Sequence, residues 1–268
     1  MSLITLSGLS VYPVKSARGI AVEGATVGPR GLDGDRCWMV VDEGRVFLSQ
    51  RSHPRLALVS VTVQGKRLQL VAPGMPPMTV DPPPSDVAAA QVQVWDDVCD
   101  AVPAGHEAAR WFSSLLGCAC ELVRMADGSQ RRVARRGDAP EAEVGFADGF
   151  PFLLISEASL EDLNRRLARR VPMDRFRPNL VVTGCEPYAE DCWSRIRIGQ
   201  VVFHVVKPCS RCSTTTVDQA TGERGREPLA TLATYRRVGD KVMFGQNLMH
   251  EGVGTLHRGD EVTVLDEV

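Results

Sequence analysis

Residues 36–49 read RCWMVVDEGRVFLS, two apolar runs on either side of Glu43-Gly44. Apolar runs of this length that flank a Gly-containing turn are typical of a β-hairpin. Residues 57–71 repeat the pattern across Gln64-Gly65. Short strands separated by turn residues indicate an antiparallel sheet that meanders or closes into a barrel.

The same pattern of short strands recurs toward both ends of the chain. Further strands are expected at 3–11, 20–27, 120–124, 179–183, 195–206, 213–217, 241–249 and 261–266. Helical spacing is restricted to 105–116, 157–168 and 228–236, and the proline-rich residues 72–84 are expected to form a loop. The predicted class is therefore α+β, mostly β, in two closely packed parts that divide near residues 117–125.

The overall composition excludes several classes of protein. The chain has 268 residues, 44% hydrophobic and 24% charged, with a net charge of −2, so no basic excess points to nucleic acid. No apolar run is long enough for a membrane span, and the N-terminus does not have the pattern of a signal peptide. We expect a cytoplasmic protein whose eight cysteines are mostly reduced.

Residues 126–142 are polar and lack periodicity, so we expect a flexible loop. It carries Arg131, Arg132, Arg135 and Arg136. These arginines either belong to a solvated loop or form a positive rim that attracts an acidic partner.

The strongest chemical signal is the segment PCSRCSTTTVD, residues 208–218. Cys209 and Cys212 form the one C-x-x-C of the sequence, which argues against a four-cysteine zinc ribbon. Arg211 is expected to lower the pKa of the neighbouring thiol and so to favour a thiolate, which is both a nucleophile and a soft metal ligand. A structural pair of buried cysteines and a thioredoxin-like redox pair remain alternatives; a threonine-rich run where a helix should begin disfavours the redox pair.

Two polar clusters elsewhere could bind an anion. Lys15 and Ser16, in YPVKS, together with Arg36 offer the donors of a phosphate or pterin clamp. In DRFRPN, Arg177 offers a planar fork for phosphate, and Asn179 can both donate and accept on a pterin edge. We expect these five side chains to converge on one cleft, although ordinary surface charges and an ion-paired strand entry are the competing interpretations.

The ordered segments YPVKS, DRCWMVV, RFRPN, CSRCSTTTVD, EPLATL and FGQN resemble those of MOSC-domain proteins with an N-terminal MOSC extension. That family includes the mitochondrial amidoxime-reducing component and bacterial proteins that detoxify N-hydroxylated bases. The resemblance covers about residues 4–266. It implies an N-terminal MOSC β-barrel-like domain over 1–118, packed with a MOSC domain over 119–268 that binds the molybdenum cofactor, Mo-molybdopterin.

The resemblance also implies roles for individual residues. Cys212 matches the molybdenum ligand. Asp148, in FADGFP, matches an acidic residue near the open side of the metal, where it could relay protons. The residues that match positions holding or flanking the pterin and its phosphate are Lys15, Ser16, Arg36, Arg177, Asn179, Ser210 and Arg211.

The implied activity is that of a molybdenum-dependent oxidoreductase that reduces small N-hydroxylated substrates. The chain starts directly in the first domain and ends at Val268 without a ferredoxin-like domain. A separate flavin or iron–sulfur protein is therefore expected to donate the electrons. The alternatives are a non-catalytic carrier of molybdenum cofactor or sulfur, and a thiol redox protein that uses Cys209 and Cys212.

Overall fold

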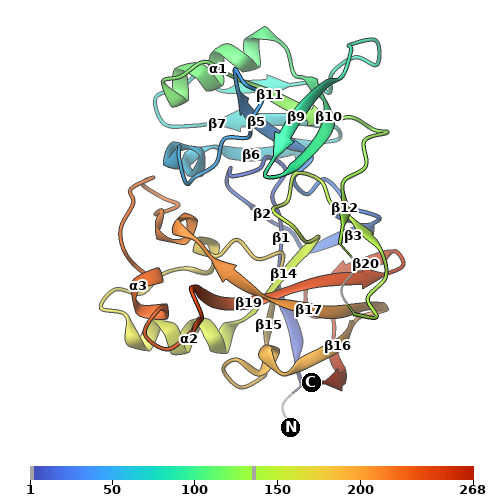
Figure 1. Cartoon of the computed structure of the whole chain (residues 1–268), viewed down its shortest axis with the longest axis vertical. Coiled ribbons are helices and arrows are strands. Elements are labelled where there is room, and N and C mark those ends of the chain that lie inside the picture. The colour runs from blue at the N-terminus through green and yellow to red at the C-terminus, as the bar shows by residue number, and fades with distance from the viewer. Residues whose placement is uncertain (1–2, 135–136) are drawn as a thin grey trace.

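The computed structural model describes residues 3–134 and 137–268 and shows two bodies stacked along the long axis of the molecule (Figure 1). The upper body in this view is formed by segments between residues 38 and 125. The lower body contains the first strands of the chain together with the strands and helices that follow residue 140. The many short strands confirm the predicted α+β, mostly β class.

The main sheet of the lower body combines the two ends of the chain. Strands β14 and β15 within it are parallel, and its other neighbouring pairs are antiparallel. Its spatial order is β2 (Ile20–Ala21), β1 (Thr5–Val11), β15 (Leu180–Thr183), β14 (Phe152–Ser156), β19 (Lys241–Glu251), β17 (Val201–Arg211), β16 (Trp193–Ile198) and β21 (Val262–Glu267), with β18 (Arg237–Val238) paired to β19. Smaller sheets beside it join β20 (Gly254–His257) with β3 (Gly24–Gly28) and β4 (Gly31–Leu32), and β12 (Arg132–Val133) with β13 (Ala142–Glu143).

The upper body contains two antiparallel sheets. One has the order β5 (Trp38–Asp42), β11 (Cys120–Met125), β10 (Asp97–Pro103) and β9 (Ala90–Val94), and the other has β6 (Ser60–Gln64), β7 (Arg67–Val71) and β8 (Met78–Val80). The hairpin predicted within residues 36–49 is present as backbone hydrogen bonds. The amide of Asp42 donates to the carbonyl of Val46 at 3.0 Å, and that of Leu48 donates to the carbonyl of Val40 at 2.8 Å.

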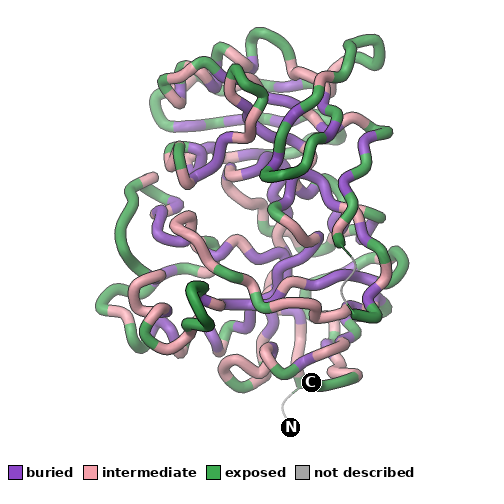
Figure 2. The backbone as a smooth tube through the Cα atoms, viewed as in Figure 1, coloured by how far each residue is buried: buried purple, intermediate pink, exposed green. Residues whose placement is uncertain are grey.

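Alternating burial explains why these residues form strands. Along β7, Leu68 and Leu70 are buried and their neighbours are exposed, as expected for a strand with one face on a core. Helix α1 (His106–Leu116) buries Trp111 and Phe112 against the same core. It ends at Gly117, whose φ of +73° is the left-handed conformation that glycine adopts at helix ends. Buried backbone follows the strands of both bodies (Figure 2).

The first thirty residues do not pack with the upper body alone. Leu6, Leu9 and Val27 belong to the core of the lower body, where they pack in one cluster with Phe152 and other side chains of the second half of the chain. Val14 already belongs to the upper core. The chain therefore starts in the lower body, contributes Val14 to the upper core, returns to the lower core with Val27 and crosses again before β5.

The other helical segments are short. Helix α2 (Glu157–Arg166) begins as predicted, because the hydroxyl of Ser156 accepts from the amide of Ser159 at 3.0 Å. Of the predicted helix 228–236, one turn is formed, α3 (Leu229–Leu232). Four 3₁₀ segments complete this set: η1 (Pro54–Leu58), η2 (Met173–Arg175), η3 (Ala189–Asp191) and η4 (Ser213–Thr216). Within the described part of the chain, no helix is long and apolar enough to cross a membrane.

Three predicted segments differ from the structure. Residues 213–217 are not a strand but η4, because the hydroxyl of Thr215 bonds back to the carbonyl of Cys212 at 3.0 Å and closes a tight turn. The predicted strand 195–206 is divided between β16 and β17. The proline-rich 72–84 includes β8, because Val80 is buried against the core.

The expectation of a solvated loop at 126–142 is wrong for Arg131. This side chain is buried, and it donates to Asp97 at 2.7 Å and to the carbonyl of Gly145 at 3.0 Å. Arg131 therefore supports the segment that follows the loop. Arg132 is exposed, whereas Arg135 and Arg136 lie outside the described residues.

Candidate active site

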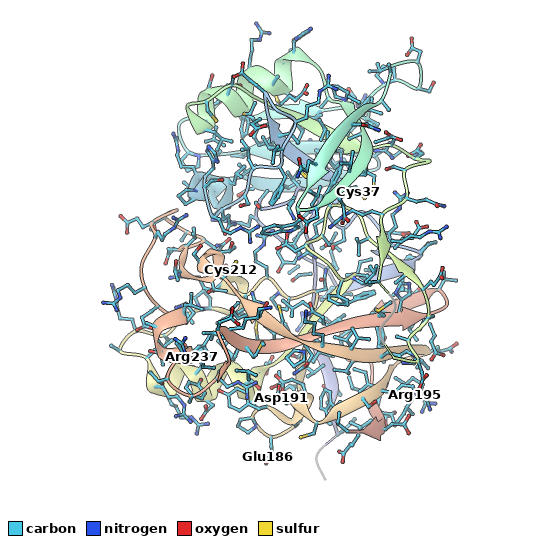
Figure 3. All side chains as sticks on the ribbon, viewed as in Figure 1. Cys37, Glu186, Asp191, Arg195, Cys212 and Arg237 are labelled. Atoms are coloured by element: carbon cyan, nitrogen blue, oxygen red, sulfur yellow. The ribbon has the colours of Figure 1, made fainter. Side chains whose placement is uncertain are left out.

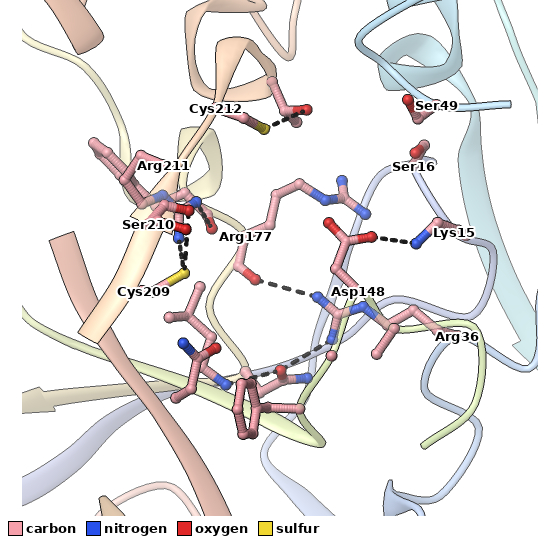
Figure 4. A pocket seen from close by; sticks show the side chains of 18 of the residues that line it. Lys15, Ser16, Arg36, Ser49, Asp148, Arg177, Cys209, Ser210, Arg211 and Cys212 are labelled. Carbon is pink, nitrogen blue, oxygen red and sulfur yellow. Dashed lines mark hydrogen bonds and ion pairs between the residues drawn. The ribbon is translucent and has the colours of Figure 1, made fainter. Parts of the chain in front are cut away.

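A cavity lies where the two bodies meet, and segments from both halves of the chain line it. Figure 3 shows Cys212 at this level of the molecule. The residues to which the family resemblance assigns a role all line the cavity, as does Cys209. They are Lys15, Ser16, Arg36, Asp148, Arg177, Asn179, Ser210, Arg211 and Cys212, and Figure 4 labels each of them except Asn179. Folding thus brings together side chains that are far apart in sequence.

Cys212 follows the last residue of β17 and starts η4. Its Sγ lies 3.4 Å from the hydroxyl oxygen of Thr214 and 3.3 Å from Nη1 of Arg51. Desolvation by itself raises the pKa of this thiol, but the hydrogen bonds of Thr214 and the charge of Arg51 outweigh it, so the pKa of Cys212 lies below the usual thiol value. The contacts of Cys212 therefore favour its thiolate form more than the surroundings of an ordinary cysteine do.

Arg211 does not contact Cys212, so the expectation that it lowers the pKa of that thiol is wrong. Its guanidinium donates instead to Sγ of Cys209 at 3.0 Å and to the carbonyl of Phe176 at 2.8 Å. In an extended strand, residues two apart share a face and residues three apart do not. Arg211 consequently pairs with Cys209, which packs against the apolar cluster around Phe244 and, like Cys212, contributes to the lining of the cavity.

Lys15 and Asp148 form a charged pair on the cavity wall (Figure 4). The ammonium of Lys15 is buried and also donates to the carbonyl of Phe146 at 2.8 Å. Burial lowers the pKa of Lys15, and Asp148 opposes that shift. Desolvation raises the pKa of Asp148, but Lys15, Arg51 and the indole N–H of Trp95 outweigh it and hold this pKa well below its usual range. Asp148 is thus ionised at neutral pH.

Two guanidinium groups stack on one buried tyrosine. The carbons of the Arg36 and Arg177 guanidinium groups lie 4.3 and 4.4 Å from the centroid of the Tyr12 ring. Burial raises the pKa of Tyr12 to about 12, and its hydroxyl donates to the carbonyl of Pro178 at 3.0 Å. Burial lowers the pKa of Arg177 to about 10, which leaves the group charged at neutral pH. Tyr12 therefore fixes two cations side by side.

Three of the lining residues have left-handed backbones without being glycine. The φ angles are +68° at Ser16, +47° at Arg36 and +57° at Arg177. Such conformations cost on the order of 1–3 kcal/mol each and concentrate at functional sites. Their occurrence at three residues of one cavity indicates that the fold places these side chains against local backbone preference.

Asn179 differs from its neighbours because its amide is already engaged. Its Nδ2 donates to the carbonyl of Ser10 and to Asp35, both at 3.2 Å, and its Oδ1 accepts from Arg36 at 2.9 Å and from the amide of Leu153 at 3.4 Å. These contacts use two donors and two lone pairs, which is the full capacity of the group. In this arrangement Asn179 positions Arg36.

Arg51 was missed in the sequence because a single arginine in a turn carries no signal. Its guanidinium lies 3.9 Å from Asp148 and stacks 4.2 Å from the centroid of the Trp95 ring. The preceding Gln50 is buried and exchanges amide hydrogen bonds of 3.0 and 2.9 Å with Gln219, beyond the cysteine motif. This pair connects the turn that carries Arg51 to the segment that follows Cys212.

The cavity carries a strong excess of positive charge. Five cationic side chains line it, Lys15, Arg36, Arg51, Arg177 and Arg211, against the single carboxylate of Asp148. Nε of Arg211 is buried and has no hydrogen-bond partner within the part of the chain that the structure describes. Among the described residues, no group of three or more His, Cys, Asp or Glu side chains is arranged to hold a metal ion. The arrangement is suited to a large anion that meets a single thiolate.

Comparison with known proteins gives consistent matches over the whole chain. A family model described as the MOSC N-terminal beta barrel domain matches residues 3–119, and one described as the MOSC domain matches residues 141–263. The mitochondrial amidoxime-reducing component 1 of Mus musculus is 38% identical, over 98% of this chain and 83% of that protein. The corresponding protein of Homo sapiens is 36% identical over the same shares. The molybdenum cofactor sulfurase of Danio rerio is 36% identical over 93% of this chain but 32% of its own length.

Proposed function

The chain belongs to the family of MOSC-domain proteins, and we therefore propose that it is a molybdenum-cofactor-dependent oxidoreductase that reduces N-hydroxylated compounds. One observation carries the proposal. A cysteine whose pKa is lowered lies at the wall of a cavity lined by five cations and one carboxylate. A thiolate beside an anion-binding cavity is the arrangement that a metal held in an anionic pterin requires.

The residues of the cavity fit this cofactor. Its phosphate needs several convergent donors to offset desolvation, and Lys15, Ser16, Arg36 and Arg177 would hold the phosphate and the pterin. Ser210 and Arg211 would lie beside them, where the partnerless Nε of Arg211 offers a further donor. Cys212 would be the protein ligand of molybdenum, and Asn179 would act on the cofactor through Arg36.

When bound, the cofactor supplies a metal that can take an oxygen atom from an N-hydroxyl group. The chain itself contributes positioning and charge. Arg51 lies between the thiolate and Asp148, within 3.3 Å of Sγ and 3.9 Å of Oδ2. We propose that Asp148 relays protons. Because Lys15 and Arg51 make its carboxylate a weak base, this role requires that an anionic group bound in the cavity offsets part of their charge.

The names of the relatives support this substrate class. Proteins that share 34–39% identity with most of this chain are named amidoxime-reducing components. We extend that activity to this chain and propose a separate flavin or iron–sulfur protein as its electron donor. A cytoplasmic location and a role in detoxification stay predictions from the sequence.

The match to molybdenum cofactor sulfurases favours a second candidate function, a non-catalytic carrier of cofactor or sulfur. In those proteins the matched region is about a third of the length. A carrier would bind the cofactor in the same cavity but would not turn over an N-hydroxylated substrate.

The test has two parts. The molybdenum and pterin contents of the purified protein are quantified, and the rate at which the protein reduces a hydroxylamine is measured with a chemically reduced dye as electron donor. Protein purified from a cofactor-competent host should contain both components and reduce the substrate. Cys212→Ala should lose activity and most of the molybdenum while its unfolding transition stays close to that of the wild type. Cys209→Ala, the matched control, should keep most activity and lose a modest part of its stability, because its thiol packs against an apolar cluster.

Other outcomes assign other functions. Cofactor without turnover supports the carrier. Equal losses from the two cysteine variants, together with sensitivity to reductant, support a thiol redox protein. A wild-type protein that contains neither molybdenum nor pterin contradicts the proposal.

A further inference from the structure

Trp95 occupies a backbone position that normally belongs to glycine. It begins the two-residue turn between β9 and β10, where Val94 pairs with Asp97, and its φ is +57°. Turns that close β-hairpins take this positive φ from glycine, asparagine or aspartate. A tryptophan in such a turn is strained, and strain of this kind is a reason to look for a function.

The ring of Trp95 is fixed beside the cavity. It stacks on the guanidinium of Arg51 at 4.2 Å and lies 5.0 Å from the ring of Phe47, and its Nε1 donates to Oδ1 of Asp148 at 3.3 Å. The turn itself is held by Gln93, whose amide donates to the carbonyl of Trp95 at 2.8 Å. Two of these partners, Arg51 and Asp148, line the cavity. The indole is therefore oriented before any ligand arrives.

Despite these contacts, Trp95 keeps 41% of its surface exposed. A rigid aromatic surface binds a planar group at little cost in conformational entropy. The cavity is lined by several cations and also by apolar side chains such as Phe150 and Phe176. The exposed face of Trp95 lies at its edge, in contact with the lining residues Arg51 and Asp148, so a planar substrate that enters the cavity can stack there.

We propose that Trp95 is a specificity-determining residue that stacks on the planar part of the substrate. The favoured class is N-hydroxylated compounds whose nitrogen is conjugated to an aryl or amidine plane, over small aliphatic hydroxylamines. This inference rests on the proposed reductase function. The competing role for Trp95 is to position Arg51 and Asp148, which would affect all substrates alike.

The experiment compares an aryl amidoxime with N-methylhydroxylamine in three variants. Trp95→Gly removes the ring and relieves the backbone strain, so it should fold at least as well as the wild type. Trp95→Phe keeps a ring but loses the bond to Asp148. Val98→Ala, an exposed apolar residue on the same hairpin, is the control and should behave as the wild type.

The expected result is a split between KM and kcat. In Trp95→Gly, KM for the aryl amidoxime should rise between about twofold and tenfold, the range of aromatic pair energies. Any change in kcat that follows from the lost bond to Asp148 should be the same for both substrates and should also appear in Trp95→Phe. The KM for N-methylhydroxylamine should change by less than about twofold, since this substrate has no planar group to stack on the indole. The KM of Trp95→Phe for the aryl amidoxime should lie between the values of the wild type and of Trp95→Gly. Equal losses for both substrates, or no loss for either, would overturn the proposal.

Binding without turnover separates this inference from the function on which it rests. If the wild type reduces neither substrate, the proposed reductase function fails, and an unreactive aryl amidine is titrated against tryptophan fluorescence. Saturable quenching in the wild type that is lost in Trp95→Gly and kept in Val98→Ala supports an aromatic subsite at Trp95. Quenching that is absent, or that survives in Trp95→Gly, rejects it.

Discussion

The ammonium of Lys15 is almost fully buried, and the carboxylate of Asp148 is its one ion-pair partner among the described residues. A buried charge that loses its partner keeps its desolvation cost without compensation. The pair therefore links the stability of the fold to the protonation state of the Asp148 carboxyl group.

Asp148→Asn should lower the free energy of unfolding by about 1 kcal/mol at pH 7, because Lys15 loses its counter-charge but the exposed carboxylate of Asp148 is screened by solvent. The pKa of Asp148 is depressed in the folded protein. Its contribution is therefore complete above the ordinary carboxyl pKa and is lost as the pH falls through the folded value. Urea unfolding from pH 7 down to pH 3 should show a constant difference between the variant and the wild type above about pH 4, which begins to narrow below it and would vanish only under more acidic conditions. Asp81→Asn, which removes an exposed ion pair with Arg67, should change little at any pH, and a pH-independent loss in Asp148→Asn would contradict this assignment.

Individual residues also show what the sequence could and could not reveal. Cys212, Arg36 and Arg177 were singled out by local motifs, and the structure brings them to one cavity. Arg51 and Trp95 have no motif, because their roles depend on a turn and a hairpin that are brought to the cavity by long-range packing. The partner of Arg211 was predicted wrongly, since adjacency in sequence does not determine which face of a strand a side chain occupies.

At the level of elements, the segment 145–149 approaches the turn at residues 35–36 closely. The amide of Phe146 donates to the carbonyl of Arg36 at 2.7 Å. A Cβ at Gly145 would lie 2.6 Å from that same oxygen. This contact places Asp148 relative to Arg36, and only glycine permits it.

Gly145→Ala should consequently destabilise the protein by about 1–3 kcal/mol, as overpacking does, and should lower the molybdenum content of purified protein. Both effects follow from a displacement of the segment that carries Asp148. Gly128→Ala is the matched control, because a Cβ there meets nothing within 4 Å. Thermal unfolding and metal analysis of the two variants check the prediction. Equal unfolding temperatures and equal molybdenum contents would contradict it, because they would show that the segment 145–149 can shift to accommodate a Cβ at residue 145.

Elements were predicted well where hydrophobic periodicity alone determines them. Helix α1 and the strands around residues 36–71 follow from buried side chains at regular spacing. The run of threonines at 214–216 was predicted as a strand from its β-branched residues, but hydroxyl-to-carbonyl bonds close it into η4. Strands β9 and β10 were missed, although Ala90–Val94 alternates apolar and polar residues as a strand with one buried face does.

At the scale of the whole molecule, the chain is interleaved. Strand β1 pairs with β15, and β3 pairs with β20 near the C-terminus. The division into domains 1–118 and 119–268 stays a proposal, and the pairing gives it a direct test.

A fragment of residues 119–268 should fail to show a cooperative thermal transition when it is expressed alone. It lacks Leu6, Leu9 and Val27, which belong to its core, and one edge of β15 is left unpaired. Circular dichroism of the fragment checks this, and adding a fragment of residues 1–118 should restore a transition. A fragment 119–268 that melts cooperatively on its own would show that β1 is dispensable.

The pairing of β1 also has a consequence in time. Ser7 and its partner Val181 are 174 residues apart, and ribosomes add about 5–20 residues each second. The first strand to leave the ribosome therefore waits roughly 9–35 seconds before its neighbour exists. During that interval its backbone edge and apolar side chains are open to other nascent chains. Slow translation of the second half prolongs this exposure, so the yield of folded protein depends on the speed at which residues near 180 are made.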